Sequence, residues 1–176
     1  MPRFIRIPTS LSDLIVVERQ RLADTRGFFS RFFCTDELAD FGIGSIAQIN
    51  HTMTQAKGTI RGMHYQNAPH DEAKFVSCLA GAVFDVAVDM RPGSPTYLKW
   101  HGEVLSAENA RSMMIPPGFA HGFQTLTENC ELIYLHDKSY APDAEDGVNP
   151  LDPKLGIAWP LPASQISVRD SQLKMM

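Results

Sequence analysis

Apolar and polar residues alternate with a period of two over much of this chain, a pattern typical of β-strands. The pattern predicts strands at 14–17, 27–33, 45–54, 82–89, 97–105, 111–115, 119–126 and 130–135. Range 35–41 has acidic residues in its first turn and apolar residues three apart, which predicts a short helix closed by Gly42. Many short strands separated by Gly/Pro turns predict an all-β sandwich or barrel, with a jelly roll the best candidate.

Range 82–89 has the most regular alternation in the chain. It places Phe84, Val86 and Val88 on one face of a strand, and Asp85, Ala87 and Asp89 on the other. The simplest interpretation of the two aspartates is a solvated strand face, and we assign them no catalytic role.

The chain beyond Tyr140 is rich in Pro, Asp and Gly and shows little periodicity. We expect 141–176 to form an irregular tail that wraps the barrel. Burial of Ile157 and Trp159 would hold this tail in place.

Composition narrows the class of protein. The 176 residues suffice for one domain spanning 1–176, and 44% hydrophobic with 20% charged residues is ordinary globular usage. The net charge is -4 and no Lys/Arg run is present, which argues against nucleic-acid binding. Residues 1–17 contain no long apolar run, so we expect no membrane span, no signal peptide and a cytoplasmic location. Three widely separated cysteines favour free thiols over a disulfide framework or a zinc site.

The segment 58–66 combines a cation and a titratable group, because Arg61 and His64 lie three residues apart with Gly62 between them. In a buried strand, His64 would face a cavity and could act as a base on a bound anion. A histidine satisfied by hydrogen bonds in the barrel wall is an equally good interpretation of this motif alone. A regular strand would put Arg61 and His64 on opposite faces, so either Gly62 hosts a bulge or Arg61 serves across a dimer interface.

Five motifs in order along the chain resemble those of the dTDP-4-dehydrorhamnose 3,5-epimerase family of nucleotide-sugar epimerases. The resemblance runs from about Asp24 to Asp170. The motifs are Arg61-Gly-Met-His-Tyr-Gln66, Val83-Phe-Asp-Val-Ala-Val-Asp89, Leu105-Ser-Ala-Glu-Asn109, Ile115-Pro-Pro-Gly-Phe-Ala-His-Gly-Phe123 and Asp152-Pro-Lys-Leu-Gly-Ile157.

The resemblance implies a cupin-type jelly roll, a homodimer, no metal and no redox cofactor. The residues agree with the absence of a metal centre, because His64 and His121 are accompanied by Tyr65 and Gln66 where further ligands would be needed. An apolar interface for a homodimer is available in the aromatic segment 28–33, for which ordinary core packing is the alternative.

The resemblance also implies catalytic roles. A 4-keto sugar has acidic C–H bonds at C3 and C5, and inversion needs a base, a group that stabilises the enolate and an acid on the opposite face. By resemblance, His64 is the base, Asp170 its carboxylate partner, Tyr134 the acid, and Lys74 the cation near the enolate oxygen. The alternatives from the residues themselves are an exposed tail acid for Asp170, a core aromatic residue for Tyr134 and a surface lysine for Lys74.

Substrate binding is implied for residues that match the family and suit a nucleoside diphosphate: Arg26, Phe29, Gln48, Asn50, Arg61, His121, Tyr140 and Arg169. We add Arg31, which stands where the family usually has a glutamate near the nucleotide base. A guanidinium only donates hydrogen bonds, whereas a carboxylate only accepts them. The substrate could therefore carry a nucleotide other than dTDP. Two other departures are Ser139-Tyr140 in place of paired tyrosines, and the atypical segment 135–138 after Tyr134.

The leading hypothesis is a cofactor-independent epimerase that inverts C3 and C5 of a nucleotide-linked 4-keto-6-deoxy sugar. A C3-only epimerase acting on a CDP- or GDP-linked sugar is a close alternative. A non-catalytic cupin that binds a nucleotide sugar and a metal-dependent cupin oxygenase or isomerase are different classes. Joint presence of His64, Lys74, Tyr134 and Asp170 argues against the non-catalytic class.

Overall fold

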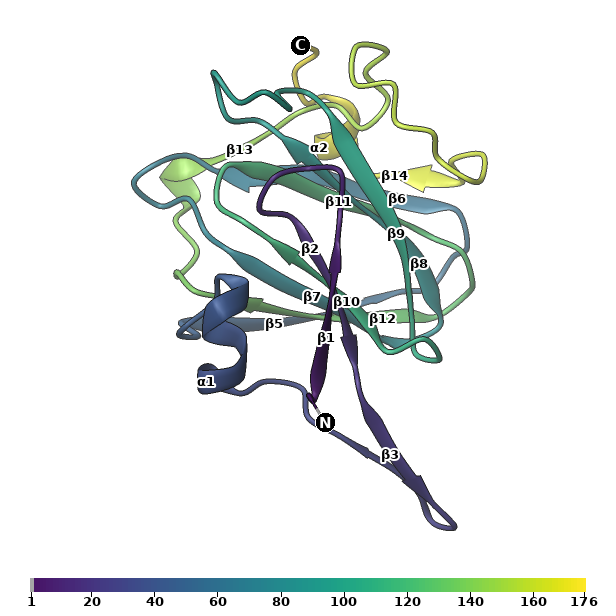
Figure 1. Ribbon diagram of the computed structural model, residues 1–176. Helices are drawn as coiled ribbons and strands as arrows, with labels where there is room; N and C mark the ends of the chain where they lie inside the picture. The colour runs from purple at the N-terminus through teal and green to yellow at the C-terminus, as the bar shows by residue number, and fades with distance from the viewer. Residues whose placement is uncertain (1) are drawn as a thin grey trace.

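Two antiparallel sheets lie face to face in the computed structural model, which describes residues 2–176 (Figure 1). The first sheet has the order β1-β2-β10-β7-β12-β5. Its strands are β1 Phe4–Pro8, β2 Ile15–Arg19, β5 Gln48–Thr54, β7 Lys74–Ala80, β10 Arg111–Ile115 and β12 Cys130–His136. The second sheet has the order β13-β6-β11-β8-β9, with β14 paired to β6. Its strands are β6 Thr59–Gln66, β8 Ala82–Asp89, β9 Trp100–Ser106, β11 Phe119–Thr125, β13 Glu145–Gly147 and β14 Gln165–Ile166. The expected all-β jelly-roll class is confirmed.

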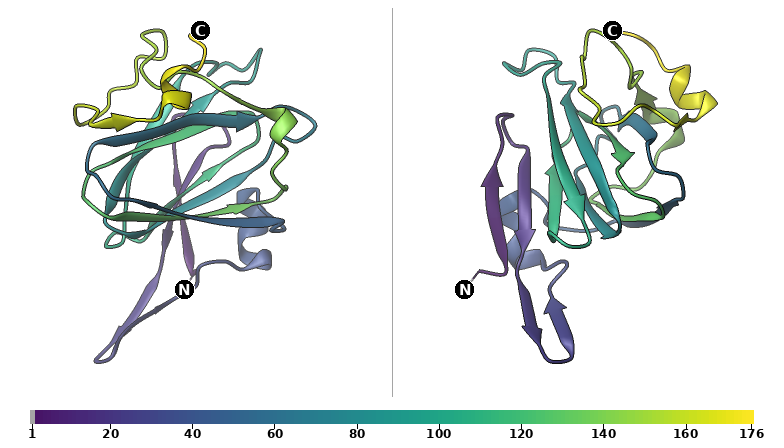
Figure 2. Two further views of the ribbon diagram at one scale, coloured as in Figure 1. Left: turned by 180° about the vertical axis from the view of Figure 1, so that it is seen from behind. Right: turned by 90° about the vertical axis from the view of Figure 1, so that its right-hand side faces the viewer.

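A separate hairpin of β3 Arg21–Asp24 and β4 Gly27–Ser30 projects from the body of the molecule (Figures 1 and 2). The strand predicted at 27–33 therefore ends early. After it the chain returns to the body, where Phe32 stacks on the guanidinium of Arg19 with the Arg19 Cζ 3.8 Å from the ring centroid.

The predicted short helix is confirmed as α1 Thr35–Leu38 followed by the 3-10 turn Ala39–Phe41. It ends at Gly42, whose φ of 101° lies in the left-handed region that favours glycine. The strand predicted at 97–105 starts later than expected, at Trp100, because the turn continues to Leu98, where φ is 61°.

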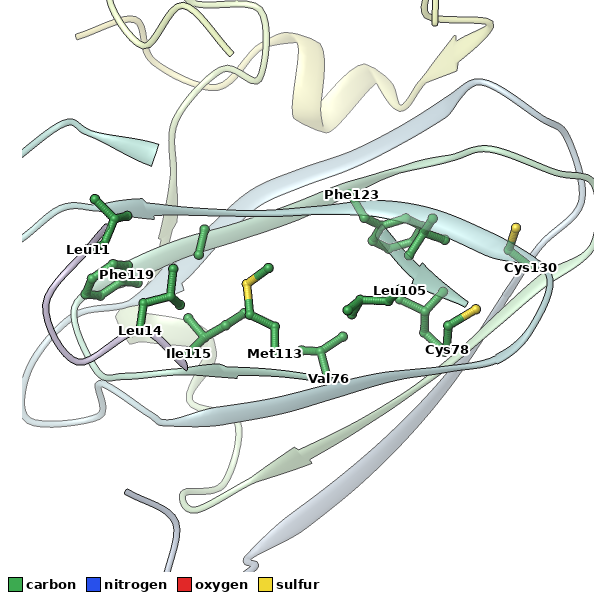
Figure 3. Packing of buried hydrophobic residues seen from close by; sticks show 13 residues of the cluster. Leu11, Leu14, Val76, Cys78, Leu105, Met113, Ile115, Phe119, Phe123 and Cys130 are labelled. Carbon is green, nitrogen blue, oxygen red and sulfur yellow. The ribbon is translucent and has the colours of Figure 1, made fainter. Parts of the chain in front are cut away.

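The space between the sheets is filled by one apolar cluster (Figure 3). Val76 and Met113 come from the first sheet and Phe123 from the second, and each is at most 2% exposed. Burying a side chain of this kind contributes about 1.5–3 kcal/mol, so this cluster is the main force that holds the sheets together.

Both faces of β8 are covered, so interpreting Asp85 and Asp89 as a solvated face was wrong: both aspartates are fully buried. The inner face of β8 carries Val83 and Ala87 of the apolar cluster. The two aspartates lie on the same face, because residues two apart in a strand point to the same side. Asp89 is satisfied by the turn that follows it, because its carboxylate accepts hydrogen bonds from Arg91 at 2.9 Å and from Ser94 at 2.6 Å.

The C-terminal segment wraps the barrel, as expected, and it covers the outer face of β8. It contains the 3-10 turn Pro142–Ala144, β13, β14 and α2 Val168–Ser171. The Trp159 ring packs edge-on against Phe84, with centroids 6.2 Å apart, and its indole N–H donates to the Pro150 carbonyl at 2.8 Å. Ile157 packs against the same cluster. Both residues are partly buried, and this apolar packing holds the segment in place, as predicted.

Strand β6 is bulged at Gly62. On the neighbouring strand β11, His121 pairs with His64 and Phe123 pairs with Arg61. Three residue steps along β6 are therefore matched by two along β11. This register shift is the bulge at Gly62, one of the two arrangements predicted from the sequence for Arg61 and His64. Gly62 has φ 125°, and a Cβ there would lie 2.6 Å from the Gly122 Cα.

We therefore expect Gly62→Ala to destabilise the protein by about 2–4 kcal/mol, because the methyl group meets backbone and the left-handed region disfavours a side chain. Urea unfolding measures the change. Gly44→Ala is the matched control: nothing lies within 4 Å of a Cβ built there, so its free energy of unfolding should change by less than about 1 kcal/mol. Equal losses in the two variants would contradict this explanation of the bulge.

Candidate active site

A cavity of about 720 Å³ opens between the two sheets and borders the apolar cluster at Phe123 and Tyr134. Both sheets and the C-terminal segment supply its walls. Of the residues expected to be functional, ten line it: Gln48, Asn50, Arg61, His64, Lys74, His121, Tyr134, Tyr140, Arg169 and Asp170. The structure thus gathers into one space side chains that are scattered over most of the sequence.

His64 and Asp170 are in contact although 106 residues separate them. The His64 Nε2 lies 2.8 Å from the Asp170 Oδ1, and the backbone N–H of Gly62 donates to Oδ2 at 3.1 Å. The Asp170 side chain is only 5% exposed. Burial by itself raises the pKa of Asp170, but the hydrogen bonds from His64 and Gly62 outweigh it, and the net pKa lies below the ordinary value. Asp170 is therefore an ionised partner for His64 and not an exposed tail acid.

Helix α2 presents this carboxylate to the bulge in β6. Ser167 caps the helix by accepting a hydrogen bond from the Asp170 N–H at 3.0 Å. The parallel pairing of β14 with β6 places the segment just before the helix against Thr59 and Ile60. Backbone pairing and the helix cap together fix where the carboxylate lies.

Tyr134 lies on β12 with its ring at the boundary between the apolar cluster and the cavity. The His121 ring meets it edge-on, with centroids 5.8 Å apart and an interplanar angle of 71°. Burial raises the pKa of Tyr134 above its ordinary value, so its hydroxyl stays protonated at neutral pH. The phenol is a proton donor facing the same cavity as His64.

Lys74 is buried and paired, as a lysine entering the core must be. Its side chain is 9% exposed, and its Nζ lies 2.9 Å from the Glu72 Oε1. The same ammonium donates to the His64 carbonyl at 3.3 Å. Gln66 holds the other oxygen of Glu72 at 2.6 Å. A fixed cation therefore lies beside the strand that carries His64.

Asp85 is a site residue that the sequence reasoning missed. Its Oδ1 accepts a hydrogen bond from the His121 Nε2 at 2.7 Å, and its Oδ2 is buried without a partner in residues 2–176. His121 faces His64 across β6 and β11. The signal in the sequence was a carboxylate within an apolar strand, which is costly unless it serves another polar group.

The cavity wall also carries a group of polar side chains around Glu145. Tyr140 donates its hydroxyl hydrogen to the Glu145 Oε2 at 2.7 Å, and its backbone N–H donates to Gln48 at 2.9 Å. Arg169 pairs with Glu145 at 2.5 Å. Glu145 is a second cavity residue that the sequence reasoning did not single out. Within residues 2–176, Arg61 forms no ion pair, which leaves its charge available to an anion.

Arg26, Phe29 and Arg31 lie outside the cavity. They belong to the hairpin that projects in Figure 2 and to the segment that follows it. The Arg26 side chain is 87% exposed and Phe29 is 63% exposed. Arg26 is paired with Asp24 at 2.5 Å, and Arg31 forms an ion pair with Glu37 of α1. In one copy of the chain these residues do not join the other candidate residues.

Two further structural findings concern metals and membranes. Within residues 2–176, no three His, Cys, Asp or Glu side chains form a group arranged to hold a metal ion. In the same range, every helix is too short to cross a membrane.

Comparison with known proteins identifies the family. The family model for dTDP-4-dehydrorhamnose 3,5-epimerase matches residues 8–176. A Pseudomonas aeruginosa protein of that name is 43% identical over 169 residues, covering 94% of this chain and 92% of the relative. The crystal structure of such an epimerase from Bacillus anthracis, with TDP and PPi bound, has a TM-score of 0.94 at 36% identity and covers 98% of this chain and 99% of that one.

A dTDP-6-deoxy-D-glucose-3,5-epimerase from Legionella pneumophila, in complex with dTDP-4-keto-L-rhamnose, has a TM-score of 0.93 at 41% identity. The alignment covers 98% of this chain and 92% of that chain. The chain therefore belongs to the dTDP-4-dehydrorhamnose 3,5-epimerase family and is an isomerase that acts on carbohydrates.

Proposed function

We propose that this protein inverts C3 and C5 of a nucleotide-linked 4-keto-6-deoxy sugar without a cofactor, with His64 as the base and Tyr134 as the acid. The observation that carries the proposal is the His64–Asp170 pair, 2.8 Å apart, on the wall of the same cavity as the protonated phenol of Tyr134.

The contact with Asp170 supports the assignment of His64 as the base. An ionised carboxylate accepts the hydrogen of the His64 Nε2, which leaves the lone pair on Nδ1 to remove a proton from carbon. After the transfer, the same carboxylate stabilises the imidazolium. Asp170 is thus a positioning residue that also provides charge.

The enolate is stabilised by a cation that is in place before the reaction. Negative charge moves to the C4 oxygen when the C3 or C5 hydrogen leaves, and a fixed cation in a partly enclosed site stabilises that charge without reorganisation. Lys74 suits this role because Glu72 and the His64 carbonyl already hold its ammonium. Tyr134 then returns a proton to the opposite face of the ring.

The diphosphate is assigned to the arginines. Arg61 lies beside the base on the bulged strand, and Arg169 lies on α2 next to Asp170. Guanidinium groups bind phosphate oxygens in pairs, which suits the diphosphate. The sugar and the nucleotide base would be contacted by Gln48, Asn50, His121 and Tyr140.

The hairpin residues reach substrate in a second copy of the chain. Arg26 and Phe29 are exposed on an element that leaves the body of the molecule, and exposed aromatic side chains on such an element are typical of an interface. We propose a homodimer in which each hairpin completes the partner's cavity.

The first prediction concerns exchange at carbon. In deuterated water the protein should label C3 and C5 of dTDP-4-keto-6-deoxyglucose, as measured by NMR or mass spectrometry. His64→Asn should reduce exchange by about 10²–10⁴-fold, the usual contribution of a general base. The matched control is His70→Asn, since His70 is exposed and outside the cavity lining.

A wild-type protein inert toward dTDP-, CDP- and GDP-linked sugars would remove the epimerase proposal. Exchange preserved in His64→Asn would place the base elsewhere. Label at C3 alone would establish the C3-only alternative.

The second prediction concerns the homodimer. We expect His64→Asn and the double variant Arg26→Ala/Phe29→Ala each to have little activity, and a mixture of the two to regain activity after subunit exchange. In a mixed dimer one cavity then has both an intact His64 and an intact partner hairpin. With random exchange about half the dimers are mixed, so about a quarter of the wild-type sites return. If the hairpin serves its own chain, mixing restores nothing.

The third prediction concerns the nucleotide. Arg31→Glu/Glu37→Gln replaces the guanidinium by a carboxylate and removes the neighbouring like charge. If Arg31 lies near the nucleotide base, kcat/KM for a dTDP-sugar relative to its CDP- and GDP-linked analogues should rise by about tenfold or more, the effect of one hydrogen bond to a charged group. Glu37→Gln is the control. An unchanged preference would show that Arg31 does not read the base.

A further inference from the structure

His136 is a third imidazole on the cavity wall, and the reaction described above does not use it. It lies on β12 two residues beyond Tyr134, so Leu132, Tyr134 and His136 share one face of the strand. Leu132 is fully buried in the apolar cluster, and Tyr134 lies at its edge. His136 therefore covers the side of Tyr134 that points away from the core.

The contact between the two rings is a stacked one. The centroids of Tyr134 and His136 are 6.2 Å apart with an interplanar angle of 20°. The other neighbour of the phenol, His121, meets it edge-on at 5.8 Å. Both arrangements are favourable for aromatic pairs. The phenol ring thus packs against two imidazoles, one of which is held by Asp85.

The charge state of His136 suits this contact. Burial, together with the positive charge of Lys74, lowers the pKa of His136 to about 4. Lys74 lies directly across the strand pair from His136, with Glu72 and His121 also nearby, and the Asn50 Nδ2 is 3.4 Å from its Nε2. A neutral ring stacks on the phenol without placing another cation beside Lys74, and without making the phenol more acidic.

We propose that His136 is a positioning residue that holds the ring of Tyr134 in the orientation from which it returns a proton to the substrate. This inference rests on the function proposed above. In that step the enolate's carbon–carbon π pair forms a new C–H bond with the phenol's hydrogen. The O–H bond breaks with its pair left on the phenolate, and the C4 carbonyl re-forms. The phenolate later regains a proton from water.

The test separates proton removal from proton return. In deuterated water, His64 alone can exchange a hydrogen with retention, whereas inversion also requires Tyr134. We expect His136→Thr to leave total exchange within about twofold of wild type and to reduce inversion per exchange event by about three- to tenfold, the usual contribution of one aromatic pair. His136→Phe keeps a flat ring against the phenol and should preserve the ratio. His70→Thr makes the same substitution at an exposed position and should change neither quantity.

A second measurement does not depend on activity. With 3-fluorotyrosine in place of the 4 tyrosines, the ¹⁹F resonance of Tyr134, assigned with Tyr134→Phe, should shift and broaden in His136→Thr but stay sharp in His136→Phe. If the threonine variant does not fold, His136→Leu fills the space without a flat ring, and the same loss is expected.

The outcomes distinguish this inference from the function on which it rests. An unchanged inversion ratio and an unchanged Tyr134 resonance in His136→Thr would overturn it. So would an equal loss in His136→Phe, because the ring nitrogens and not the stack would then matter. Wild-type protein that exchanges no hydrogen would remove the proposed reaction, whereas the ¹⁹F result would still decide whether His136 orders the phenol.

Discussion

The carboxylate of Asp170 joins the C-terminal segment to the bulge in β6, and the candidate site depends on this contact. One oxygen accepts from the His64 ring and the other from the Gly62 N–H. A buried carboxylate without such partners would cost several kcal/mol, whereas each hydrogen bond to it returns about 1.5–3 kcal/mol. Docking of the segment and orientation of the His64 ring are therefore achieved by one interaction. The bulge is part of it, because it turns the Gly62 N–H toward the carboxylate and brings Arg61 and His64 to the same cavity.

The strands that build the apolar cluster also build the cavity. Along one face of β12 the side chains change from Leu132 in the core to Tyr134 at the boundary and His136 at the wall. Along β7 the same change runs from the buried Val76 to Lys74. The polar groups thus extend directly from a close-packed core, which fixes their backbone and gives the side chains few alternative positions.

Period-two alternation was sufficient to predict most strands and the jelly-roll class, because strand periodicity is a local property. It could not assign the faces of β8, since alternation does not distinguish a face in water from a face covered by another part of the chain. Asp85 was missed for that reason: its partner, His121, lies on β11, and only the register of the two strands brings them together. The pairing of His64 with Asp170 came from the family resemblance, because no spacing rule connects residues 106 positions apart. The position of the hairpin, and hence of Arg26 and Phe29, depends on tertiary geometry that local patterns do not contain.

The two ion pairs on the cavity wall differ in how firmly their charges are held. Lys74 and Glu72 form an ion pair with both side chains more than nine-tenths buried, and Gln66 fixes the carboxylate from behind. Breaking a buried pair of this kind is costly, so the Lys74 ammonium stays in place. Arg169 and Glu145 form a half-exposed pair, for which typical coupling is below about 1 kcal/mol. Exchange of Glu145 for another anion at Arg169 therefore costs little. In the proposed reaction, Lys74 would supply a rigid charge at the enolate oxygen and Arg169 an adaptable one at the diphosphate. This is the division expected if binding energy from the nucleotide orients the sugar for reaction.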